Sequence, residues 1–83
     1  PNQLAFGVYP NPTNGALNVT LSNHSHNAVI DIYDMQGRIV YHQGGITGSG
    51  NILLDLQDLE NGTYVLVIRT NEGSGNSRIV IQN

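Results

Sequence analysis

Alternating apolar and polar residues run through most of this chain. Leu17, Val19 and Leu21 alternate with polar residues, which is the period-two pattern of a strand with one face on a core and the other in water. Each such run is short and predicts a β-strand. Three further runs alternate in the same way, with apolar positions at Ala28, Ile30 and Ile32, at Ile39 and Tyr41, and at Ile52, Leu54 and Leu56.

Glycine-containing pairs and turns separate these runs. Two Asn-Gly pairs, at residues 14–15 and 61–62, readily supply the positive φ angles of tight turns. Residues 34–37 read Asp-Met-Gln-Gly, in which the aspartate can accept a local backbone hydrogen bond and the glycine can take a left-handed conformation. The pattern predicts a hairpin across residues 33–38.

Two segments are too polar and too rich in glycine to predict regular structure. They are residues 43–50, which contain four glycines, and residues 71–76. Both are expected to be loops. Residues 56–59 predict a single helical turn that connects two strands.

The strand count defines the fold class. Adding strands near residues 4–8, 63–70 and 78–82 gives about seven strands at roughly ten-residue spacing, and no helical periodicity runs through the chain. The sequence therefore predicts one all-β domain, residues 1–83, folded as an immunoglobulin-like β-sandwich of about seven antiparallel strands. Residues 1–5 are expected to be a linker or the frayed start of the first strand.

Composition narrows the function classes. The 83 residues are 39% hydrophobic and lack cysteine, which fits one globular domain too small to enclose a large active-site pocket. The net charge of −3 has the wrong sign for nucleic-acid binding. The longest apolar run, residues 64–68, is far shorter than a membrane-spanning helix. Because the chain begins with Pro1, we expect it to be one end of a longer protein.

Two histidines form the best candidate for a metal site. His24 and His26 lie two residues apart and would point to one side of a strand, where they could hold zinc or copper. No third ligand lies nearby, and the position of His42 relative to the pair is open. A solvated turn is the favoured interpretation.

The acidic residues also lack a supporting pattern. Asp55, Asp58 and Glu60 could supply oxygens to calcium but do not follow a calcium-loop spacing. Asp31 and Asp34 could form an acid–base pair. All five are interpreted as solvated carboxylates.

The serines do not complete a catalytic motif. Ser49 and Ser74 lie between glycines, but no helix is expected after either, as a nucleophile elbow requires. The sequence therefore predicts no catalytic residues, no metal site and no cofactor.

The order of several short motifs resembles a known family. Residues 9–15 read Tyr-Pro-Asn-Pro-Thr-Asn-Gly, residues 33–38 read Tyr-Asp-Met-Gln-Gly-Arg, and residues 55–64 contain Asp-Leu, then Leu59, then Gly-Thr-Tyr. Together with a final β segment, they are similar over nearly the whole chain to the type A C-terminal sorting domain of the type IX, or Por, secretion system. Arg78 stands where relatives usually carry lysine.

The resemblance implies a domain fused behind a cargo such as a protease, glycosidase or adhesin. The cargo would cross the inner membrane with its own signal, dock on the outer-membrane translocon through this domain and reach the cell surface. A sortase-like peptidase usually cuts upstream of the domain. The residues that the resemblance assigns to translocon recognition are Pro10, Pro12, Gly15, Gly37, Gly62, Tyr64, Arg78, Ile79, Val80 and Ile81.

The strand pattern adds two candidate surfaces. Val65 and Val67 alternate with residues expected to face inward, and with Val80 they predict an apolar strip that could bind a partner or a second copy of the chain. The last strand, residues 78–82, is expected to offer its backbone and Arg78 to a receptor by edge pairing.

An alternative from another class is a carbohydrate-binding or spacer module of an extracellular enzyme. Sugar-binding faces commonly display planar rings, and the chain has no tryptophan. Its aromatic residues are Phe6, Tyr9, Tyr33, Tyr41 and Tyr64, and the alternation assigns several of them to the core.

Overall fold

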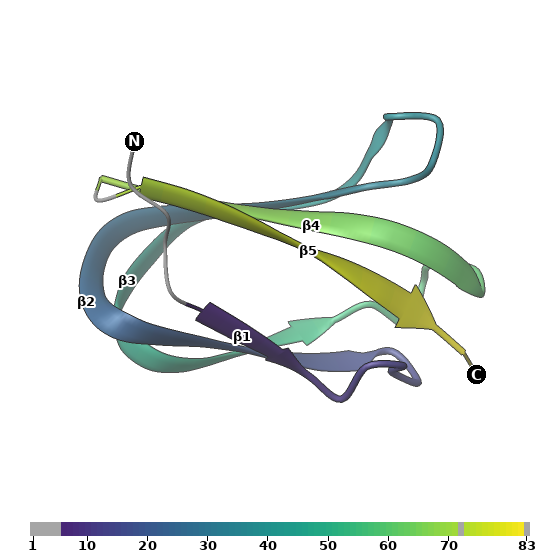
Figure 1. Cartoon of the computed structure of the whole chain (residues 1–83), viewed down its shortest axis with the longest axis horizontal. Helices are drawn as coiled ribbons and strands as arrows, with labels where there is room; N and C mark the ends of the chain where they lie inside the picture. The colour runs from purple at the N-terminus through teal and green to yellow at the C-terminus, as the bar shows by residue number, and fades with distance from the viewer. Residues whose placement is uncertain (1–5, 72, 83) are drawn as a thin grey trace.

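The protein is an all-β sandwich (Figure 1). The computed structural model describes residues 6–71 and 73–82, with the backbone alone for 22–27 and 47–50. The predicted linker or frayed start at residues 1–5 lies outside this part. All strand pairs are antiparallel, and the strands are β1 (Phe6–Tyr9), β2 (Ala16–Tyr33), β3 (Ile39–Asp55), β4 (Gly62–Thr70) and β5 (Gly73–Ile81).

The two longest strands bend and serve both layers of the sandwich. β2 has 18 residues and β3 has 17, and Figure 1 shows them curving together at the left. The first half of β2 pairs with β1 and with the second half of β3. The second half of β2 pairs with the first half of β3 and with β4, which pairs with β5. β1, β4, β5 and two segments each from β2 and β3 make seven strand segments in two layers, which confirms the predicted fold.

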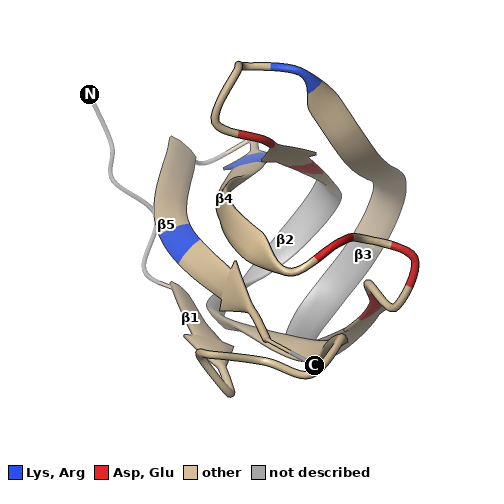
Figure 2. Ribbon diagram, turned by 90° about the vertical axis from the view of Figure 1, so that its right-hand side faces the viewer, with Lys and Arg blue, Asp and Glu red and all other residues tan. Residues whose placement is uncertain are grey.

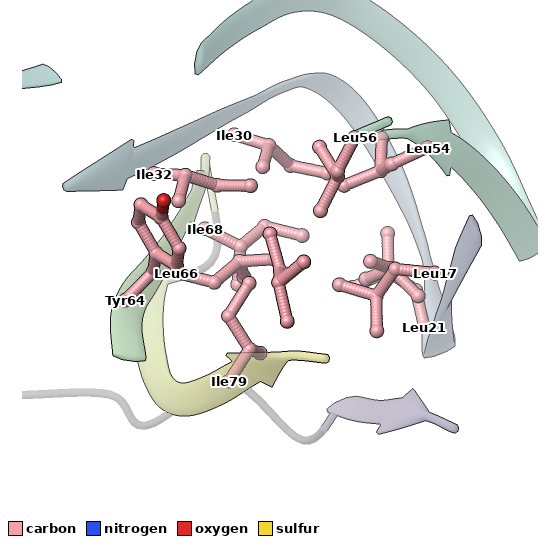
Figure 3. Close-up of a cluster of buried hydrophobic side chains, with 12 residues drawn as sticks. Leu17, Leu21, Ile30, Ile32, Leu54, Leu56, Tyr64, Leu66, Ile68 and Ile79 are labelled. Carbon is pink, nitrogen blue, oxygen red and sulfur yellow. The ribbon is translucent and has the colours of Figure 1, made fainter. Parts of the chain in front are cut away.

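The core lies between the layers (Figure 3). Apolar side chains from both point toward one another there, and each fully buried one contributes about 1.5–3 kcal/mol to folding. The alternation predicted most of them correctly. The buried cluster consists of Leu17, Val19, Leu21, Ile30, Ile32, Leu54, Leu56, Tyr64, Leu66, Ile68, Ile79 and Ile81.

Both predicted glycine-rich loops are wrong. Residues 43–50 belong to β3, and β5 already begins at Gly73. Both segments pair with neighbouring strands, residues 43–50 with β2 and residues 73–76 with β4, and register shifts in the β2–β3 ladder accommodate the bend. Glycine tolerates such bends because it has no side chain to clash with its neighbours.

The face predicted for Ile39 is also wrong. Its side chain is 55% exposed, while Tyr41 is half-buried. The β2–β3 register shifts between the pairs Ile32–Tyr41 and Tyr33–Ile39, which leaves Val40 as an extra residue on β3. The strict alternation of inward and outward side chains is therefore broken at the start of β3. Val40 packs against the core cluster instead.

The turns around the sandwich agree with prediction. The Asp34 N–H donates to the Arg38 carbonyl at 2.9 Å, and the Gly37 N–H donates to the Asp34 carbonyl at 3.0 Å, which closes the predicted hairpin. In the β3–β4 connection the Leu59 N–H donates to the Leu56 carbonyl at 3.1 Å.

Among the described residues, no helix is long and apolar enough to cross a membrane.

Candidate functional site

The segments that carry the family resemblance meet at one end of the sandwich. We call this region, residues 9–15, 34–38, 55–64 and 78–82, the motif end. In Figure 1 it lies at the right, and Figure 2 looks directly onto it. The opposite end holds the bend of β2 and β3.

The turn after β1 is joined to the last strand. The Thr13 N–H donates to the Val80 carbonyl and the Gln82 N–H donates to the Thr13 carbonyl, both at 2.8 Å. The Asn11 side chain extends this pairing, because its Nδ2 donates to the Arg78 carbonyl at 2.9 Å and its Oδ1 accepts the Val80 N–H at 3.0 Å. We call these four hydrogen bonds the 11–13 clamp.

The clamp occupies the outer edge of β5 at its C-terminal end. Alternate residues of a strand direct their backbone groups to opposite sides, and β4 already pairs with the inner side. The expectation that residues 78–82 present a free edge for pairing is therefore wrong for this fold, since the clamp uses the outward groups of Arg78, Val80 and Gln82.

The same turn rests on the β3–β4 connection. The Leu56 N–H donates to the Gly15 carbonyl at 2.6 Å. Gly15 has φ 120°, and a Cβ at this position would lie 2.8 Å from Cγ of Gln57. Thr13 is buried, and its Oγ1 donates to the Ala16 carbonyl at 2.5 Å and accepts the Gly15 N–H at 3.1 Å. The turn is thus fixed on both sides, and glycine is required at position 15.

Asp34 organises the β2–β3 turn. Its Oδ1 accepts the N–H groups of Gln36 at 2.9 Å and Arg38 at 3.0 Å, and its Oδ2 accepts Nε of Arg38 at 2.9 Å. The Arg38 backbone hydrogen bond, with the Arg38 side chain and the Gln36 N–H, lowers the pKa of Asp34. Asp34 is therefore charged and engaged within its own turn.

Tyr64 links the core to the β3–β4 connection. It packs in the core as predicted, and its hydroxyl donates to the Glu60 carbonyl at 2.6 Å. Burial raises the pKa of Tyr64, and the negative charges of Glu60 and Asp34 raise it further. The phenol is therefore neutral and serves as a donor.

A hollow opens between the β2–β3 turn and the start of β4. It has a volume of about 430 Å³ and is lined by residues from 34–40 and 58–64. Two of the family motifs thus face each other across one concave surface.

The residues assigned to translocon recognition fall into two groups. Gly15, Tyr64, Ile79 and Ile81 are buried, so a partner could sense them only through the shape they support. The others reach the surface, with Val80 half-buried and the remaining five exposed, namely Pro10, Pro12, Gly37, Gly62 and Arg78.

The candidate apolar strip lies on the outer face of the β4 layer. Val65 and Val67 are half-buried and alternate with core residues. Val65 pairs with Arg78, and Val80 pairs with Thr63 on the same ladder. The three valines thus share a face that Arg78 interrupts.

Asp31 differs from its sequence interpretation. It is only 6% exposed, whereas the sequence indicated a solvated carboxylate. Its Oδ1 lies 2.5 Å from Nδ1 of His42, and its Oδ2 accepts Nη1 of Arg69 at 3.0 Å, which joins β2, β3 and β4. Asp34 binds a different cation, Arg38, so the two aspartates form no acid–base pair. The alternation within one strand carries no information about partners on neighbouring strands, so the sequence did not indicate the contacts of Asp31 with His42 and Arg69.

The remaining candidate residues that the structure describes do not come together in a catalytic or metal-binding arrangement. The side chains of His24, His26 and Ser49 lie outside the described residues. Asp55, Asp58, Glu60 and Ser74 are exposed. Within residues 6–71 and 73–82, no group of three His, Cys, Asp or Glu side chains could hold a metal ion.

The aromatic side chains do not form a sugar-binding platform. Tyr9 is 50% exposed and is the one aromatic residue among the exposed large side chains of the described part. For the alternative function as a carbohydrate-binding module, Tyr9 is therefore the one exposed aromatic ring in the described part that could stack on a sugar.

Comparison with known proteins is consistent with this architecture. An immunoglobulin-like β-sandwich of the DUF3244 family from Bacteroides vulgatus has a TM-score of 0.73 and covers 95% of this chain and 96% of its own. Its sequence identity of 18% makes this a likeness of fold alone. No curated protein matches the sequence.

A sequence family gives the more specific result. The family described as "Secretion system C-terminal sorting domain" matches residues 7–82, which include every segment of the motif end. The chain therefore belongs to the family of type IX secretion system C-terminal sorting domains.

Proposed function

We propose that this domain directs a cargo protein, fused to its N-terminal side, through the type IX translocon to the cell surface, and that the machinery reads the motif end. As a sorting domain the chain interacts with the type IX secretion machinery and belongs to proteins that are exported to the surface or secreted. We assign it recognition rather than catalysis.

The observation that carries the proposal is the 11–13 clamp. It holds the Pro10–Gly15 turn against the last strand, although the bonded residues are 67 and 69 positions apart for the Asn11 contacts. The Gly15 carbonyl adds the β3–β4 connection to the same unit. A receptor can therefore meet all motif segments on one folded surface, rather than a linear peptide.

The position of the cargo fits this arrangement. β1 begins at Phe6, which pairs with Leu21 beside the bend, whereas Thr13 bridges to Ile81 at the motif end. The molecule measures 32 Å along its longest axis. A cargo attached before β1 thus enters on the side away from the motif end and leaves that end accessible.

Cleavage by a sortase-like peptidase would fall upstream of β1. A cut there releases the cargo and leaves the sandwich intact, because the strand pairs of β1 lie downstream of it. We therefore propose removal of the domain as one folded unit.

The test is a reporter fused to residues 1–83 and expressed with its own inner-membrane signal. Two isogenic hosts are compared, one with the type IX translocon and one without. We expect surface or medium delivery in the first and periplasmic retention in the second. Equal distribution in both hosts would reject the proposed function.

A further inference from the structure

We propose that the hollow at the motif end binds a lysine or arginine side chain, carried beside an apolar residue on an extended segment of a partner protein. The inference rests on the proposed function, and the partner is a component that meets the domain during export. The hollow lies between residues 34–40 and 58–64.

The floor of the hollow is apolar. Val40 and Leu59 are half-buried and pack against the core cluster, and the Tyr64 ring lies beside them. Met35 stands at the rim with 61% of its side chain exposed. The hollow has a volume of about 430 Å³, which falls within the ~300–1,000 Å³ of ordinary binding sites. Such a floor suits an apolar side chain and the hydrocarbon stem of a basic one.

The rim of the hollow is acidic. Asp34, Asp58 and Glu60 line it together with one arginine, Arg38, which leaves a net charge of −2 (three negative, one positive). Asp34 and Arg38 engage each other at 2.9 Å. Within the described part of the chain, no ion pair involves Asp58 or Glu60, and both residues are exposed where they line the hollow. Figure 2 shows these acidic segments, in red, along the β3–β4 connection.

Charge and shape together select the occupant. Complementary charge favours a cationic group and disfavours anions or nucleic acid. An apolar floor beside the carboxylates favours an amphipathic side chain over a bare ion, since an ion gains nothing from Val40 or Leu59. A basic residue next to an apolar one, on an extended segment, meets both demands.

The decisive variants change charge without touching the clamp. Asp58→Asn with Glu60→Gln raises the net charge by two and leaves the Glu60 carbonyl that Tyr64 uses. The control, Asn71→Lys with Asn76→Lys, raises it equally at exposed positions outside both the hollow and the motif end. Thermal melts establish that both proteins fold.

The first readout is binding of the acetylated and amidated tripeptide Leu-Lys-Leu, followed by amide chemical shifts of the ¹⁵N-labelled domain. We expect shifts confined to residues 34–40 and 58–64, and affinity about fivefold weaker in the Asp58/Glu60 variant but unchanged in the control. Shifts elsewhere, no shifts, or equal loss in both variants would overturn the inference.

The second readout is surface delivery of the reporter fusion. We expect the Asp58/Glu60 variant to lose at least about fivefold of delivery while the control resembles wild type. If wild type is delivered and the Asp58/Glu60 variant is delivered equally, the hollow has no role but the sorting function stands. If wild type itself is not delivered, the proposed function fails, and the peptide titration still decides on the hollow.

Discussion

The Asn11 side chain takes the place of a neighbouring strand beside Val80. Its Oδ1 accepts the Val80 N–H at 3.0 Å while its Nδ2 donates to the preceding outward carbonyl, that of Arg78, at 2.9 Å. A side-chain amide has the same donor and acceptor as a peptide unit, so it can complete the edge of a strand. The C-terminal half of β5 is thereby held from both sides, by β4 and by the clamp.

Asn11→Ala should destabilise the domain by about 1–2 kcal/mol, because it removes two hydrogen bonds from the edge of β5. Urea denaturation measures the change, and faster hydrogen exchange at the Val80 amide locates it. Asn76→Ala is the matched control, since Asn76 is exposed on the same strand. Unaltered exchange at Val80 would contradict the assigned contact.

Gly15→Ala should cost more stability than Gly37→Ala. At Gly37, with φ 87°, no atom lies within 4 Å of an added Cβ, so the cost is backbone strain of about 1 kcal/mol. At Gly15, with φ 120°, the added Cβ also collides with Gln57 at 2.8 Å, which brings the cost to about 2 kcal/mol or more. Equal denaturation midpoints for the two variants would show that the turn does not rest on the β3–β4 connection.

Asp34 should contribute to acid sensitivity. Its pKa is lowered in the folded protein, so the stability it provides is present above the unfolded pKa of about 3.9 and is lost as the pH falls through the folded pKa. Wild type should exceed Asp34→Asn in stability at pH 6, and the two should converge toward pH 2. A constant difference across this range, measured by thermal melts, would remove the charge of Asp34 as the cause.

Arg69→Met should destabilise the domain by about 1 kcal/mol, because the buried Asp31 carboxylate then loses its arginine partner but keeps its contact with His42. A double-mutant cycle with Asp31→Asn measures the coupling. Arg78→Met is the control, an exposed arginine on the same face. Additive effects of the Arg69 and Asp31 changes would mean that the ion pair contributes nothing.

The sequence predicted the fold because each strand carries its own pattern. Leu17, Val19 and Leu21 alternate over a regular ladder, and the structure buries all three. The pattern fails where pairing partners decide the outcome. Residues 43–50 look like a loop in isolation, yet β2 supplies a partner for them. Ile39 faces outward because the β2–β3 register shifts at Val40, between the pairs Ile32–Tyr41 and Tyr33–Ile39.

The candidate site was predicted less completely, for a related reason. The motifs identified the segments, but periodicity within one strand carries no information on contacts between residues far apart. Asn11 with Val80 and Asp31 with Arg69 are 69 and 38 positions apart. The clamp and the buried carboxylate therefore required the tertiary structure, and the clamp reverses the expectation of a free terminal edge.

We propose that the folded motif end, with its turn locked to the last strand, is the sorting signal. The test is surface delivery of a reporter fused to the wild-type domain, to Asn11→Ala or to Ile68→Val. Ile68→Val removes a core methylene far from the motif end at a similar cost of about 1 kcal/mol. We expect translocon-dependent delivery of wild type and Ile68→Val, and reduced delivery of Asn11→Ala. Equal delivery of all three, or equal losses in both variants, would contradict it.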